Sequence, residues 1–260
     1  MSNRIDLNCD IGEGFGVYRM ADDDAMLDLV SSVNVACGFH AGDADIMASL
    51  VTKTLKRGIA LGAHPGFRDL HGFGRREIKG IPPRELRNLI IYQVGALQAL
   101  ARAGGYRVTH MRTHGALANM SESDVAMGRI VAEACHDIDP RLMLMTRPDC
   151  TVDRAGRTLG LSIVRQAFAD RAYNDDGTLV SRRQPGAVIH NPDFAAERML
   201  QLAEKGTLQS INGKTLRMEI DTICVHGDTP AAVQMAEAVR GKLENNGFRI
   251  LAYNKSTDVA

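Results

Sequence analysis

The sequence lacks the features that mark several large classes of protein. Basic and acidic side chains balance at 31 each, so no excess charge favours nucleic acid or an anionic membrane as a partner. No apolar run approaches the length of a membrane span. The N-terminal MSNRIDLNCDIGEG carries acids where a signal peptide would be apolar. These absences predict a soluble, cytoplasmic protein that binds neither nucleic acid nor membrane.

Familiar nucleotide-binding and catalytic signatures are missing as well. Gly213-Lys214-Thr215 resembles the end of a phosphate loop, but Gly206 lies too far upstream for GxxxxGK. The loop from Gly12 to Gly16 does not fit GxGxxG, and neither GxSxG nor HEXXH occurs. The five cysteines include no CxxC pair, which is typical of a reducing compartment. For Cys37 and Cys224 a small buried apolar group is a better interpretation than a nucleophile.

What the chain does contain is a repeated order of apolar strand, glycine break and polar group. Asn34 to Asp43, read NVACGFHAGD, is the clearest example. Runs rich in β-branched and apolar residues predict seven strands and an eighth at the end. Their expected ranges are Arg4–Cys9, Val33–Cys37, Ile59–Ala63, Tyr106–Met111, Leu142–Met145, Leu161–Val164, Asp221–Val225 and Phe248–Tyr253.

Longer segments with helical periodicity separate most of these strands. Asp43 is expected to cap a helix that ends at Arg57 before Gly58, and a prolonged apolar stripe predicts a helix from Pro83 to Gly104. Further helices are expected at Asp22–Ser31, at about Glu122–Cys135, at Pro192–Lys205 and between Pro230 and Gly247. The segment Asn174–Asn191 reads as a loop, and Asn212-Gly213 as a hairpin turn.

Strands that alternate with helices, with no linker between them, predict one α/β domain over residues 1–260. A complete or distorted β/α barrel is favoured over an open doubly wound sheet. Polar motifs follow nearly every strand, whereas in a doubly wound sheet they would cluster at one or two switch points.

The polar groups at these strand ends suit an active site, because the ends of parallel strands share one edge. Converging imidazoles and carboxylates serve general acid–base catalysis, and they can equally hold a divalent metal that activates water. Asp10, His40 and His64 are the candidate metal ligands. Arg171, and with less support Arg75 and Arg76, could bind a substrate carboxylate in bidentate fashion.

Nine motifs together identify a family. They are DLNCDIGEGFG, SSVNVACGFHAGD, GAHPGF, GFGRR, YQVGALQALARAGG, THMRTHGAL, FADRAY, PGAVI and ICVHGD. With them the chain resembles the LamB/YcsF family from near Arg4 to the last strand. The resemblance implies an irregular seven-stranded, TIM-like β/α barrel of the glycoside hydrolase/deacetylase type.

The resemblance also implies a reaction, the ATP-dependent opening of the 5-oxoproline lactam to L-glutamate together with two partner oxoprolinase subunits. Some members of the wider superfamily hold a metal through an Asp and histidines at strand ends. We expect catalytic roles for Asp10, Glu13, His40, Asp43, His64, His114, Asp170, His226 and Asp228. We expect substrate-binding roles for Asn8, Arg76, Arg112, Gln166 and Arg171.

The sequence departs from the family pattern at four positions. Where the family usually has HVKPHGALYN, this chain carries Arg112, Thr113 and Ala118 in place of the lysine, proline and tyrosine, and Gln166 replaces a glutamate. Arg112 keeps a positive charge, but Gln166 cannot act as an acid or a base. Two alternatives therefore stay open: a diverged, metal-dependent amide hydrolase or deacetylase, and a non-catalytic substrate-binding subunit. Homo-oligomerisation also stays open.

Overall fold

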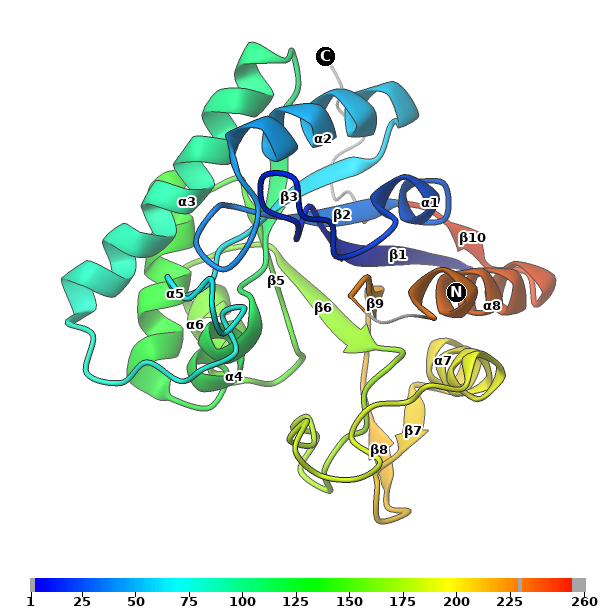
Figure 1. Ribbon diagram of the computed structural model, residues 1–260. Helices are drawn as coiled ribbons and strands as arrows, with labels where there is room; N and C mark the ends of the chain where they lie inside the picture. Colours follow the sequence, from blue (N-terminus) through cyan, green and yellow to red (C-terminus); the bar gives the residue numbers. More distant parts are fainter. Residues whose placement is uncertain (1–2, 229–230, 254–260) are drawn as a thin grey trace.

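A computed structural model describes residues 3–228 and 231–253. Seven parallel strands form a closed barrel, because β1 pairs with β2 on one side and with β9 on the other (Figure 1). This closure confirms the barrel and rules out the open doubly wound sheet. The barrel strands are β1 Arg4–Ile11, β2 Ser32–Ala36, β3 Ala60–His64, β4 Val108–Met111, β5 Met143–Thr146, β6 Ile163–Phe168 and β9 Thr222–His226.

The helices lie around the outside of the barrel (Figure 1). They are α1 Asp23–Leu27, α2 Ala44–Arg57, α3 Pro83–Ala103, α4 Gly115–Ser121, α5 Val125–Ile138, α6 Thr151–Thr158, α7 Pro192–Lys205 and α8 Ala232–Asn245. Apolar faces of these helices pack on outward-facing strand residues to form a continuous core. β10 (Arg249–Ile250) extends the sheet beside β1, and β7 (Thr207–Gln209) pairs with β8 (Thr215–Arg217) as a separate hairpin.

The barrel interior is filled with polar side chains. Successive strand residues point to opposite faces, so the apolar residues of β1 face the helices while Asn8 and Asp10 face inward. Asn8 Oδ1 accepts hydrogen bonds from Asn34 Nδ2 (2.9 Å) and from Gln166 Nε2 (3.0 Å). His110 Nε2 lies 3.0 Å from Asn34 Oδ1. These bonds satisfy groups that would be costly to bury alone.

Helix ends follow the expected capping residues closely. The Asp43 side chain accepts a hydrogen bond from the Ile46 N–H at the start of α2, and Gly58 adopts the left-handed conformation at its end, with φ 67°. The expected bounds of α3 and α7 and the hairpin turn at Asn212-Gly213 are also confirmed. Thr229 and Pro230, expected to open the last helix, lie outside the described residues.

Several expected elements differ from the structure. The first helix is short, because the backbone leaves it after Leu27 to reach the start of β2. Helices α4 and α6 were not expected, and α5 begins at Val125 rather than near Glu122. Strand β6 continues to Phe168, so Gln166 lies inside the strand and not at its end.

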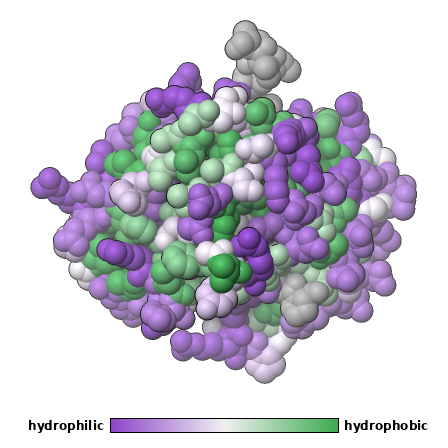
Figure 2. All heavy atoms as spheres, turned by 45° about the horizontal axis from the view of Figure 1, so that its top comes forward, coloured by the Kyte–Doolittle hydropathy of each residue, from purple (hydrophilic) through white to green (hydrophobic). Residues whose placement is uncertain are grey.

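The molecular surface is mixed in character. Figure 2 shows hydrophilic and hydrophobic residues interspersed over the visible face. Within the described residues, no helix is both long and apolar enough to cross a membrane. All five cysteines are buried and unpaired, in agreement with the interpretation of Cys37 and Cys224 as small buried groups. Burial raises the pKa of the Cys224 thiol well above its usual value, which makes it a poor nucleophile.

Candidate active site

Four acid–base side chains from four consecutive strand ends meet at one mouth of the barrel. Glu13 follows β1, His40 follows β2, His64 ends β3, and His114 follows β4. Glu13 Oε1 lies 3.3 Å from both His40 Nε2 and His114 Nδ1, and His64 Nε2 lies 3.0 Å from His114 Nδ1. We call these four residues the histidine cluster. All four side chains are buried, and their potential ligand atoms lie within 4.8 Å of one another.

Backbone carbonyls fix the protonation of two of the imidazoles. His64 Nδ1 donates a hydrogen bond to the Arg112 carbonyl (2.8 Å), and His114 Nε2 donates to the Phe73 carbonyl (2.8 Å). A carbonyl can only accept, so each of these nitrogens carries the proton. His64 Nε2 and His114 Nδ1 are therefore the lone-pair atoms of the neutral rings, and they face each other.

Burial sets the charge states within the cluster. It lowers the pKa of His40, His64 and His114, which keeps the three imidazoles neutral. Burial, aided by Asp10 and Asp228, raises the pKa of Glu13 well above its usual value. Glu13 is thus a carboxylic acid that can donate a proton, beside imidazoles that can accept one.

Glycines allow the close packing of the rings. The His40 and His114 rings stack with centroids 3.7 Å apart. A Cβ at Gly66 would lie 2.7 Å from His40 Nδ1, and one at Gly74 would lie 2.8 Å from His114 Cδ2. The GAHPGF and GFGRR motifs therefore supply space as well as side chains.

A buried ion pair lies beside the cluster. Arg112 Nη1 contacts both oxygens of Asp10, at 2.5 and 2.7 Å, and lies 3.3 Å from His64 Nε2. Burial alone would raise the pKa of Asp10, but Arg112 and His64 hold it well below its usual value. The Asp10 carboxylate is therefore charged and already neutralised by the guanidinium.

A second imidazole–carboxylate pair lies at the end of β9. His226 Nδ1 contacts both oxygens of Asp170, at 2.8 and 2.9 Å. Burial raises the pKa of Asp170, but the pairing with His226 lowers it overall. A charged Asp170 orients the ring so that Nε2 faces the barrel mouth, 3.8 Å from Asp10 Oδ2.

The structure brings most of the expected catalytic residues together but groups the expected metal ligands differently. Asp10 pairs with Arg112 and is grouped with Cys224 and His226, whereas Glu13 joins the histidines. Asp43 does not enter the site, because its two oxygens accept hydrogen bonds from the backbone N–H groups of Ile46 and Gly16. Its role is to cap α2.

The expected substrate-binding residues also divide. Arg112 lies at the site, but Asn8 and Gln166 lie deeper in the barrel interior, where they bond to each other. Arg76 is exposed and bonded to Asp69, and Arg171 donates to the Val180 and Ala187 carbonyls. These contacts make Arg76 and Arg171 supports of their loops.

Sequence reasoning missed three residues in or near the site. His110 and Asn34 lie on strands inside the barrel, and Arg182 lies in the long loop after β6. Arg182 carried no signal, because nothing in the sequence distinguishes it from Arg183. The inward alternation of β4 could have found His110, since Met111 on the opposite face belongs to the apolar core.

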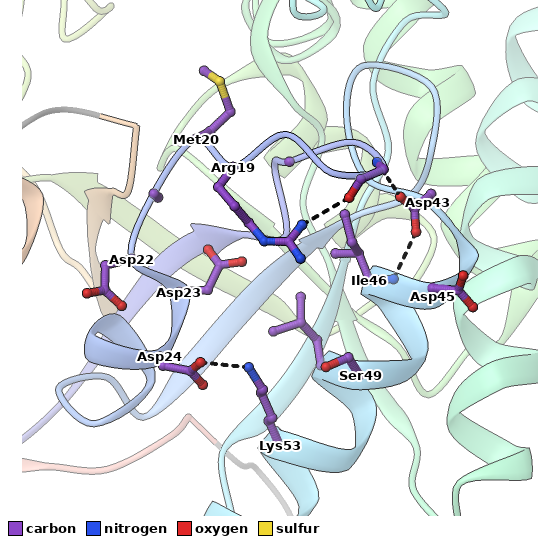
Figure 3. A pocket seen from close by; sticks show the side chains of 14 residues that line it. Arg19, Met20, Asp22, Asp23, Asp24, Asp43, Asp45, Ile46, Ser49 and Lys53 are labelled. Atoms are coloured by element: carbon purple, nitrogen blue, oxygen red, sulfur yellow. Dashed lines mark hydrogen bonds and ion pairs between the residues drawn. The ribbon is translucent and has the colours of Figure 1, made fainter.

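A separate pocket lies outside the barrel mouth. Its volume is about 660 Å³, and it is bounded by the loop after β1 and by α2. Figure 3 shows Asp22, Asp23 and Asp24 on one side of it, with Lys53 bonded to Asp24. This acidic pocket does not include the histidine cluster.

Sequence comparison places the chain in a family. The LamB/YcsF family model matches residues 5–258. The chain belongs to the LamB/YcsF family. Two relatives, from Nitrobacter hamburgensis and Rhodopseudomonas palustris, are named as the A-type subunit of 5-oxoprolinase and are 52% and 51% identical to it. Each alignment covers 96% of this chain and 98% of the relative.

Structural comparison agrees with the family assignment. The lactam utilization protein from Thermus thermophilus superposes with a TM-score of 0.91 at 38% identity, over 96% of this chain and 100% of that one. The catalytic domain of a peptidoglycan N-acetylglucosamine deacetylase from Eubacterium rectale superposes with a TM-score of 0.54 at 11% identity, over 99% and 91%. The second likeness concerns the barrel fold alone.

Proposed function

We propose that this chain is the lactam-opening component of an ATP-dependent 5-oxoprolinase, which converts 5-oxoproline to L-glutamate with two partner subunits. One observation carries the proposal: a buried acid–base cluster lies at the barrel mouth of a chain about half identical to relatives named for that enzyme. Cytoplasmic location belongs to the same proposal.

The side chains at the mouth suit the opening of an amide ring. Ring opening needs a base to take a proton from water and an acid to protonate the departing nitrogen. A neutral imidazole, His114 or His226, can act as the base, and protonated Glu13 can act as the acid. Arg112, fixed by Asp10, offers positive charge where the carbonyl oxygen becomes negative.

ATP as a co-substrate is assigned to the assembled enzyme. The sequence holds no phosphate loop, and the pocket beside α2 is lined by five aspartates against Arg19 and Lys53. Such a surface repels a polyphosphate. A lactam is a poorly reactive amide, and transfer of a phosphoryl group to its carbonyl oxygen would make the carbonyl carbon easier to attack. We therefore expect the partner subunits to contribute to ATP binding.

The histidine cluster also fits a divalent metal. Four donors at Zn–N distances of about 2.0–2.1 Å in a tetrahedron lie roughly 3.3 Å apart. The separations measured between cluster atoms are 3.0, 3.3 and 3.3 Å. A cation would also relieve the repulsion between the facing lone pairs of His64 and His114. Glu13, His40, His64 and His114 are thus the residues that would hold a metal, which would supply polarisation of a carbonyl or of a bound water.

The same cluster supports a second candidate function. A metal-dependent amide hydrolase or deacetylase would use a bound ion and no ATP, and Arg112 and Gln166 mark a departure from the family pattern. Metal content and ATP dependence separate the two functions.

The decisive experiment combines the purified chain with its two partner subunits and measures glutamate released from 5-oxoproline with and without ATP. We expect release only with ATP. The double variant Arg112→Lys, Gln166→Glu restores the family residues, and a gain of activity in it would assign the divergence to function. Amide cleavage by the chain alone, without ATP and with one equivalent of metal, would replace this proposal with the second candidate.

A further inference from the structure

Two loops from distant parts of the sequence meet in an ion pair at the barrel mouth. Arg75 lies in the loop between β3 and α3, and Asp228 follows β9. Arg75 Nη2 donates to Asp228 Oδ2 at 2.6 Å. The Asp228 side chain is 8% exposed, while that of Arg75 is 34% exposed and open to a ligand.

The ion pair adjoins the histidine cluster. The Arg75 guanidinium lies 4.9 Å from the centre of the Phe73 ring, which meets the His114 ring edge to face at 5.3 Å. Phe73 also supplies the carbonyl that fixes His114. A ligand held by Arg75 and Asp228 would therefore reach the groups that perform the proposed reaction.

Hydrogen-bonding capacity of the pair is left over on both partners. Asp228 Oδ1 is buried and accepts no hydrogen bond from any described residue. Arg75 has five N–H bonds, and within the described chain only one of them, on Nη2, has an oxygen acceptor. A buried carboxylate oxygen without a donor is costly, which indicates that a ligand donates to it.

The unused groups define the chemical class of that ligand. It must offer an N–H to Asp228 and, close by, an anionic acceptor to Arg75. An amide nitrogen attached to a carbon that bears a carboxylate has both, on neighbouring atoms. The ring nitrogen and carboxylate of 5-oxoproline have this arrangement, and so do open-chain N-acyl amino acids.

We propose that Arg75 and Asp228 together recognise the N–H and α-carboxylate edge of an N-acyl amino acid, with the cyclic lactam as the preferred form. This inference rests on the proposed function and adds what selects the substrate. Arg75 binds the carboxylate, Asp228 Oδ1 accepts the amide N–H, and the far side of the amide is left to face the histidine cluster.

Arg182 adds positive charge to the same space. Burial and the neighbouring Arg75 lower the pKa of its guanidinium, while the nearby Asp170 and Asp228 raise it. Like charges gathered in a partly buried place favour an anion between them. The Arg171 side chain anchors this loop through the carbonyls of Val180 and Ala187, on either side of Arg182.

The test is steady-state kinetics of the enzyme assembled with its partner subunits. 5-Oxoproline is the substrate, and 2-pyrrolidinone, which lacks the carboxylate, and N-methyl-5-oxoproline, which lacks the N–H, are the inhibitors. Arg75→Gln should raise KM for 5-oxoproline about 10- to 100-fold, as for loss of a hydrogen bond to a charged group. Inhibition by 2-pyrrolidinone should not change. Asp228→Ala should erase the preference of the wild type for 5-oxoproline over its N-methyl form.

Arg57→Gln is the matched control, because it breaks an exposed ion pair with Asp28 far from the barrel mouth. It should leave KM and both inhibition constants at wild-type values. Lactam opening in which Arg75→Gln and Asp228→Ala keep wild-type KM and selectivity would overturn this inference alone. A wild-type assembly that opens no lactam would overturn the proposed function and this inference with it.

Discussion

Asn34 joins the polar groups inside the barrel. Its Nδ2 donates to Asn8 Oδ1 (2.9 Å) and to Asp10 Oδ1 (3.0 Å), and its Oδ1 accepts from His110 Nε2 (3.0 Å). Asp10 is thereby held from below by an amide and from the side by Arg112. A carboxylate fixed in this way cannot turn toward the histidine cluster, which explains why Glu13 takes its place there.

The His110 ring has its position because residue 62 has no side chain. A Cβ at Gly62 would lie 2.0 Å from His110 Nε2. We expect Gly62→Ala to lower the free energy of unfolding by about 1–3 kcal/mol, the usual cost of overpacking a core. In a His110→Ala background the same change should cost much less, since the clashing ring is gone. Chemical denaturation of the four proteins measures this, and an equal cost in both backgrounds would contradict the packing argument.

Helix α1 illustrates how an element can be recognised while its bounds and energetics are not. The acids of its first turn were read correctly as favourable to the helix dipole, but one of them, Asp23, is partly buried and accepts a hydrogen bond from the Gly12 N–H. Burial raises the pKa of Asp23 to about 6. The acid that marks the helix in the sequence therefore opposes folding at neutral pH.

The shift has a definite sign for stability. Protonated Asp23 is favoured in the folded state, so stability should fall as pH rises from about 4 to about 6, by up to roughly 2–3 kcal/mol. Asp23→Asn keeps the acceptor for Gly12 and should unfold at a higher temperature than wild type at pH 7–8, with little difference at pH 4. The exposed neighbour Asp24, changed to Asn, should not reproduce this. Parallel stability curves for wild type and Asp23→Asn would refute the account.

Most elements could be predicted because their signals are local. Capping residues, proline and apolar periodicity located α2, α3 and α7, and the hairpin followed from Asn212-Gly213. Helix α6 escaped because its segment TVDRAGRT has no apolar stripe, and α4 because it spans only seven residues.

The site was predictable as a set of strand ends but not as a set of contacts. Glycine breaks after apolar runs identified His40, His64 and His114. The pairing of Arg112 with Asp10, and of Arg75 with Asp228, joins residues 102 and 153 positions apart and depends on how the barrel closes. The same closure decided that Glu13, rather than Asp10, meets the histidines, and that Asp43 serves as a cap.

At the scale of the whole molecule, the barrel is a rigid polar interior that opens at one mouth onto acid–base groups. Apolar residues face outward to the helices, so the interior is free to carry Asn8, Asp10, Asn34, His110, Gln166 and Thr222 in a bonded layer. Loops after β1, β2, β3, β4 and β9 bring the reactive side chains above that layer. The central claim is that this mouth, through the histidine cluster, performs the chemistry.

The most direct test is kcat for ATP-coupled glutamate formation by the enzyme assembled with Glu13→Gln. The substitution keeps size and burial but removes the acid. We predict a fall of about 100-fold or more, as for loss of a general acid, while KM for 5-oxoproline and assembly with the partner subunits stay close to wild type. A kcat near the wild-type value would show that the histidine cluster is structural and that the reaction occurs elsewhere.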